Sequence, residues 1–315
     1  MDGRRDVSRL HIHIATETVG TQARWASPAH ELDQGAMSVL LEIPDGSPWW
    51  LSPDIWTVPG SNPEAAPGMP VAGEQCYLWA HVLNNGTEPV ANATVRFFWA
   101  NPAVGFDRNT ATHIGDASVS LQPMEGQDVL CLVPWVPSFL NNGHECVLAE
   151  AFHPTLDPLP PGPAFEVPTD RHVAQRNLSV IKLAAGMARF AISFEIHNTA
   201  RVSRTFALRA KAGATDQLRP LKARLGRAIS LKGTGSAKHA GFIAGAQPCA
   251  GDEEVNKATE SIVVAPGGRG ALTLTGELSG DAAMVHVVQE ADGAEVGGLS
   301  VLVTRAKAAN KRARA

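Results

Sequence analysis

Short, regularly spaced strand patterns constrain this chain more than any other feature. In residues 76–82, Leu78, Ala80 and Val82 alternate with Tyr77, Trp79 and His81, as expected for a strand with one buried face. Residues 84–87 read as a turn between this strand and the next, so a hairpin is expected here. Further strand patterns follow at short intervals: "ATVRFFWA", "ASVSLQP", "QDVLCLVPW" and "ECVLAEAF". Many short strands with turn residues between them predict a β-sandwich.

A second set of strand patterns begins after residue 180. Residues 189–198 alternate apolar and polar side chains, and Asp292-Gly293 reads as a tight hairpin turn. One short helix is also predicted, because four apolar residues recur at helical spacing between positions 217 and 230. They are Leu218, Leu221, Leu225 and Ile229. The further strand patterns are "RTFALRAK", "ESIVVAPG", "GALTLTGEL", "MVHVVQE" and "LSVLVTR".

The fold prediction is therefore all-β, with two tandem immunoglobulin-like sandwiches, an N-terminal strand-forming arm and at most one short helix. A length of 315 residues suits about two domains. Residues 1–45 carry strand patterns, "RLHIHIATE" and "SVLLEI", which must join a sheet because isolated strands are unstable. We expect them to pair with the first sandwich, within the chain or across a subunit contact. The remaining predicted boundaries are 46–180, 181–306 and a basic tail at 307–315.

Four cysteines occur, and none forms a CxxC pair. A bridge between Cys76 and Cys146 would resemble the one that joins immunoglobulin sheets. Strand parity argues against it, because Cys76 should face inward while Cys146 shares the parity of Glu150, which we expect to face outward. The sequence therefore favours free thiols.

Four segments carry a resemblance to a known family: "WLSPDIW" (50–56), residues 77–102, "HECVLAEAFHP" (144–154) and "RHVAQRNLSV" (171–180). Together they resemble a bacterial immunoglobulin-like domain of the CARDB type, the cell-adhesion-related domain, over roughly residues 48–180. The resemblance implies an adhesion, spacer or assembly role. It brings no catalytic residues with it.

Several polar groups are candidates for catalytic or metal sites. His11 and His13 share a strand face, and His144, His153 and Asp157 lie near a proline-rich stretch of six prolines in 18 residues, expected to be a loop. Residues 233–241, "GTGSAKHAG", match neither a phosphate-binding loop nor a dinucleotide fingerprint. Solvated strands and loop caps explain these residues better. The sequence predicts a protein that is not an enzyme and needs no metal or cofactor.

An aromatic row is the first candidate binding surface. Tyr77, Trp79 and His81 should lie on the outer face of their sheet, where they suit a protein or a glycan. The alternative is that residues 1–45 cover them, in this chain or a neighbour.

Charge provides the second candidate surface. Residues 1–180 contain 8 arginines, no lysine and 20 acidic residues, a net charge of −12, whereas residues 181–315 contain 19 basic and 11 acidic residues, a net charge of +8. Opposite potentials of this kind steer one molecule towards another. The candidate binding cations are Arg201, Arg204, Arg209, Lys211, Arg219 and Lys222.

Three function classes remain open. The favoured one is a structural or adhesion protein that self-associates, by heterologous contacts between its acidic and basic halves, into a homo-oligomer or filament. The alternative is an accessory module that binds a glycan or another protein. Nucleic acid is disfavoured, because the strongly acidic first half would oppose a polyanion. No apolar run reaches the roughly 18–20 residues of a membrane span. No secretory signal is visible, so a cytoplasmic location as synthesised, or export by another route, is expected.

Overall fold

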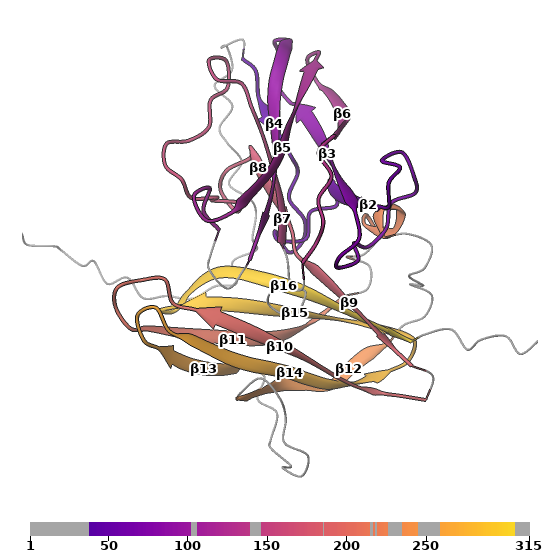
Figure 1. Cartoon of the computed structure of the whole chain (residues 1–315), viewed down its shortest axis with the longest axis vertical. Helices are drawn as coiled ribbons and strands as arrows, with labels where there is room; N and C mark the ends of the chain where they lie inside the picture. Colours follow the sequence, from indigo (N-terminus) through magenta and orange to yellow (C-terminus); the bar gives the residue numbers. More distant parts are fainter. Residues whose placement is uncertain are drawn as a thin grey trace, which may run out of the picture. The chain divides into compact units, whose positions relative to one another are not determined.

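The structure is a computed structural model that describes residues 38–101, 106–138, 146–184, 186–214, 217, 219–225, 235–244 and 259–305. These residues form strands β1 to β16 and one 3₁₀ helix, η4 (Lys222–Arg224). The all-β prediction is confirmed: both halves are β-sandwiches (Figure 1). Within the described residues, no helix is long and apolar enough to cross a membrane.

The first sandwich has two sheets. In one, β3 pairs with β6 along one side and with β1 and β2 along the other. The other sheet has the order β5-β4-β7-β8 and is antiparallel throughout. The strands are β1 (Leu41–Glu42), β2 (Ile55–Pro59), β3 (Cys76–Asn84), β4 (Val90–Ala100), β5 (Thr112–Leu121), β6 (Glu125–Leu130), β7 (Cys146–Phe152) and β8 (Val173–Arg176).

The expected hairpin at residues 84–87 is wrong. β3 and β4 lie in different sheets, so the turn carries the chain from one sheet to the other. The buried Asn84 side chain fixes this crossing, because its amide donates to Glu88 O over 2.8 Å and its oxygen accepts from Gly86 N over 3.1 Å and from Leu40 N over 3.2 Å. A turn signal in sequence does not distinguish a hairpin from a crossing between sheets.

The second sandwich packs a five-stranded sheet, β13-β11-β15-β16-β9, on a three-stranded sheet, β10-β14-β12 (Figure 1). Asp292 and Gly293 have φ values of 51° and 84° at the β15–β16 turn, so the predicted hairpin is confirmed. The strands are β9 (Leu178–Leu183), β10 (Arg189–His197), β11 (Arg204–Gly213), β12 (Ser236–Ala244), β13 (Thr259–Val264), β14 (Arg269–Ser279), β15 (Ala282–Ala291) and β16 (Ala294–Arg305).

The passage between the sandwiches is one residue long. β8 belongs to the first sandwich and β9 runs parallel to β16 in the second, so Asn177 alone separates them. The passage therefore falls before the predicted boundary at residue 180, because residues 178–180 already pair with the second sheet.

In its described part, the predicted helical face forms a 3₁₀ turn at Lys222–Arg224. Leu221 and Leu225 are buried as expected, and they pack against Trp50 and Leu302 in a small core of their own. Ile229 and Leu218 lie outside the described residues.

Of the N-terminal arm, the described part begins at residue 38. Leu41 and Glu42 pair with Asn84 and Leu83 of β3 in the same chain, and Leu41 is buried in the first core. The strand pattern "RLHIHIATE" lies outside the described residues.

Candidate functional site

The aromatic row lies where strand parity predicts. Leu78, Ala80 and Val82 are fully buried in the first core, whereas Tyr77, Trp79 and His81 are half-buried on the opposite face of β3. The row therefore lies on the outer face of its sheet.

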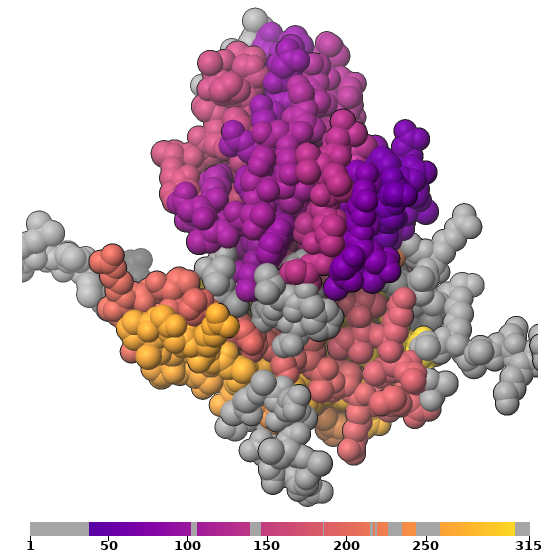
Figure 2. All heavy atoms as spheres, viewed as in Figure 1, coloured from indigo at the N-terminus to yellow at the C-terminus, as the bar shows by residue number. Residues whose placement is uncertain are grey.

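Part of this face is covered within the chain. Trp79 stacks on Trp56 of β2 with ring centroids 5.9 Å apart, and its Nε1 donates to Pro63 O over 3.0 Å. Tyr77 Oη accepts from Gln75 Nε2 over 2.8 Å. Within the described residues these contacts come from β2 and the loop after it, residues 56–75, at the indigo side of the first sandwich (Figure 2). Most of the expected cover, residues 1–45, lies outside the described residues.

A cation from the second half of the sequence completes the stack. The guanidinium carbon of Arg224 lies 3.5 Å from the Trp56 ring centroid, within cation–π range, and its Nη2 lies 3.7 Å from Asp128 Oδ2. Asp128 Oδ1 in turn lies 2.6 Å from His81 Nδ1. Burial raises the pKa of the neighbouring Asp54, while the charges of His81 and Arg224 oppose that rise. The sequence reasoning missed this arrangement because no local pattern links residues so far apart.

The six candidate cations divide into two groups. Arg204 Nε donates to Asp292 Oδ2 over 2.7 Å, and Arg209 forms an ion pair with Glu290, so both are used inside the second sandwich. The other four are exposed, and within the described part of the chain they form no ion pair. They are Arg201, Lys211, Arg219 and Lys222.

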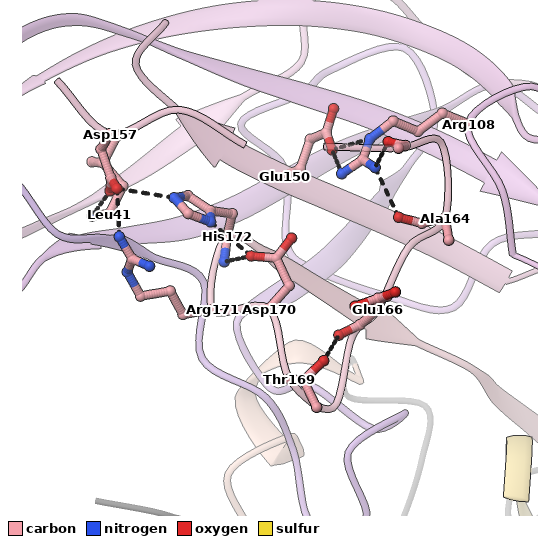
Figure 3. Close-up of polar contacts among 11 residues, drawn as sticks. Leu41, Arg108, Glu150, Asp157, Ala164, Glu166, Thr169, Asp170, Arg171 and His172 are labelled. Atoms are coloured by element: carbon pink, nitrogen blue, oxygen red, sulfur yellow. Dashed lines mark hydrogen bonds and ion pairs between the residues drawn. The ribbon is translucent and has the colours of Figure 1, made fainter. Parts of the chain in front are cut away.

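A buried polar network surrounds the Asp157 carboxylate (Figure 3). It accepts from Leu41 N over 2.6 Å, pairs with Arg171, and lies 3.1 Å from His172 Nε2. His172 Nδ1 lies 2.7 Å from Asp170 Oδ1. Burial alone would raise the pKa of Asp157 and lower that of His172, but these contacts reverse both directions, favouring a carboxylate–imidazolium pair.

A second buried carboxylate holds the proline-rich segment in place. Glu150 is fully buried and accepts from Arg108 Nε over 2.8 Å, while Arg108 Nη1 donates to Ala164 O over 2.8 Å (Figure 3). We expected Glu150 to face solvent. Its parity is as predicted, but residues 153–170 cover that face of β7, with Phe165 and Val167 packing against Cys146.

Two of the candidate catalytic groups, His153 and Asp157, have structural roles. His153 Nδ1 accepts from Leu156 N over 3.1 Å and so caps a turn, while Asp157 anchors β1. In the described residues, no group of three or more His, Cys, Asp or Glu side chains is arranged to hold a metal ion. His11, His13, His144 and the start of the 233–241 segment lie outside them.

The described cysteines are free thiols. Cys76, Cys131 and Cys146 are buried without a disulfide, as favoured from parity. Burial raises the pKa of the Cys76 thiol to about 12, and it raises the pKa of Cys146 well above its ordinary value. Such thiols are unreactive.

No family model matches the sequence, and no curated protein matches it. Similar solved structures include a CARDB domain from Pyrococcus furiosus in complex with di-metal ions, at 16% identity and a TM-score of 0.27, covering 46% of this chain and 94% of that one. Two adhesins are also similar. The CupB6 tip adhesin from Pseudomonas aeruginosa has 11% identity and a TM-score of 0.22, covering 87% and 99% of the two chains. The collagen adhesin from S. aureus has 8% identity and a TM-score of 0.24, covering 80% and 92%. TM-scores this low assign neither a family nor a function.

Proposed function

We propose that this chain is a non-catalytic structural protein of the adhesion or assembly type, which self-associates through contacts between the acidic first half and the basic second half. The observation that carries the proposal is the set of exposed cations in the second half, Arg201, Lys211, Arg219 and Lys222, which form no ion pair within the described residues. Carboxylates of a second copy supply the complementary charge, because residues 1–180 have a net charge of −12.

The contact is heterologous, because the acidic surface of one copy meets the basic surface of the next. Such contacts close a ring or extend a filament. Charge sets the direction and speed of the encounter, and apolar surface supplies most of the affinity. Exposed apolar residues are present for this purpose along the segment after β6, where Leu132 is 74% exposed and Val136 is 56% exposed.

The alternative, an accessory module that binds a glycan or protein through Tyr77, Trp79 and His81, receives less support. Trp79 already stacks on Trp56, its N–H group is already bonded to Pro63 O, and His81 is already bonded to Asp128. A glycan would have to displace these contacts before stacking on the ring.

Static light scattering across ionic strength tests the proposal. We expect the mass of the wild-type particle to exceed that of a monomer at low salt and to fall as salt screens the charges over about 8–10 Å. The variant Arg219→Glu/Lys222→Glu should remain smaller than the wild type at equal concentration.

A matched control separates the surface from net charge. Lys182→Glu/Arg189→Glu makes the same change in charge at two exposed cations outside the proposed surface. Equal loss of association in both variants would contradict the assignment of the surface. A wild-type protein that stays monomeric at high concentration and low salt would rule out self-association, and glycan-array binding that survives high salt would favour the alternative.

A further inference from the structure

We propose that the Arg176 guanidinium, at the passage between the two sandwiches, binds one small inorganic anion of the halide class. Arg176 is the last residue of β8 and is 5% exposed. Its Nη1 donates to Ile55 O over 2.8 Å. Its Nη2 is buried and, among the described residues, has no hydrogen-bond partner. This inference is independent of the proposed self-association.

Three other arginines that are at least partly buried show what Arg176 lacks. Arg108 meets Glu150, Arg171 meets Asp157, and Arg209 meets Glu290, so each has a carboxylate. Within the described part of the chain, Arg176 has no carboxylate at ion-pair distance. A buried guanidinium without an opposite charge is destabilising, and this makes an external counter-ion favourable.

The position of Arg176 explains why the site is closed. Ser52 N donates to Gln175 O over 2.9 Å, so residues before β2 run beside β8 and then cross to join β3. Arg176 spans this crossing from the edge of one sheet to the edge of the other, through its bond to Ile55 O. Because the Arg176 side chain is almost inaccessible to solvent, only a small ligand can reach its guanidinium group.

The surrounding charge also favours an anion. Burial is the main cause that lowers the pKa of Arg176, to about 10, and the positive charge of Arg224 adds to the effect. Among the described residues, the carboxylate at ion-pair distance from Arg224 is that of Asp128, with its Oδ2 3.7 Å from Arg224 Nη2. An anion bonded to Arg176 Nη2 would relieve the repulsion between the two guanidinium groups.

Thermal unfolding at constant ionic strength tests the site with chloride or bromide as the probe. Replacing gluconate, which is too large for the site, by either halide should raise Tm in a saturating manner. Arg176→Met should abolish the rise. Arg189→Met, which removes an exposed arginine outside the proposed association surface, should keep it.

Two further measurements keep the inference falsifiable if Arg176→Met does not fold. Arg224→Met leaves Arg176 in place and should weaken the apparent halide affinity severalfold. Crystals grown in bromide should show an anomalous peak within hydrogen-bond distance of Arg176 Nη2. The proposal is overturned if Tm does not respond to the halide, or if a water molecule bridging Arg176 Nη2 to Asn177 Oδ1, another buried atom without a partner, occupies the position.

Discussion

Trp50 Nε1 donates a hydrogen bond to Ser300 Oγ over 3.2 Å, joining residues that are 250 positions apart in the sequence. The bond begins a polar chain. Ser300 Oγ lies 2.9 Å from His286 Nδ1, and His286 Nε2 lies 2.8 Å from Gln217 Oε1. Gln217 Nε2 then donates to Ser47 O over 3.0 Å. Because the Gln217 amide nitrogen is the donor to Ser47, its oxygen must accept, so His286 carries its proton on Nε2.

The one-residue passage lies beside this chain of bonds. Asn177 N donates to Trp50 O over 2.8 Å, and its side-chain amide donates to Gly298 O over 2.8 Å. Trp50, Leu221 and Leu302 bury an apolar cluster at the same place. The passage is therefore held by backbone, side-chain and apolar contacts together.

Gly298→Ala should destabilise this passage. A Cβ at Gly298 would lie 2.5 Å from the Trp50 indole, which is closer than two carbon atoms can approach. The indole is packed in a buried cluster, so a change of its rotamer would not relieve the clash. Overpacking of this kind costs about 1–3 kcal/mol, measured as the free energy of unfolding in urea. Val296→Ala, at an exposed position on the same strand, should change it by less than about 0.5 kcal/mol. Equal stability of Gly298→Ala and wild type would show that Trp50 does not pack on Gly298.

His286 should make the free energy of unfolding decrease at acid pH. Burial, with the charge of Lys211, lowers the pKa of His286 to about 4 from an ordinary value of 6.5. The unfolded chain therefore binds the proton first, and stability falls as pH drops from about 6.5 towards 4. His286→Gln removes the titrating group, so urea unfolding should show a smaller loss of stability over that range than in wild type. Parallel pH profiles for both proteins would contradict the role of His286.

The sequence predicts which side chains share a face of a strand more reliably than it predicts whether that face is exposed or which strands pair. The alternation in β3 placed Tyr77, Trp79 and His81 correctly, because parity depends only on neighbouring residues. The prediction that Glu150 is exposed was wrong, because the segment that covers β7 is a proline-rich loop without a periodic pattern. The hairpin after β3 was wrong, because partner strands are chosen by tertiary packing. The contact between Arg224 and Trp56 leaves no sequence signal.

Glu150→Gln should strongly destabilise the first sandwich. The substitution keeps the shape of the side chain but removes the charge that Arg108 faces, leaving a largely buried guanidinium unpaired. Breaking a buried pair in this way costs about 3–5 kcal/mol. Chemical denaturation should show the loss, and limited proteolysis should cut residues 158–164 faster because Arg108 no longer holds Ala164 O. Glu166→Gln, at an exposed residue of the same loop, is the control. Unchanged proteolysis in Glu150→Gln would mean that the loop is held by other contacts.

Arg224→Met tests the stack on the outer face of the first sandwich. The guanidinium covers Trp56 and lies near Asp128, so its loss removes a cation–π contact worth about 0.5–2 kcal/mol and exposes the indole. We expect lower stability in urea and a red shift of tryptophan emission, whereas Lys222→Met, at an exposed neighbour, should change neither. A double-mutant cycle with Trp56→Phe isolates the pairwise contribution, because a real contact makes the two losses less than additive. Strictly additive losses would show that Arg224 stabilises the chain through other contacts.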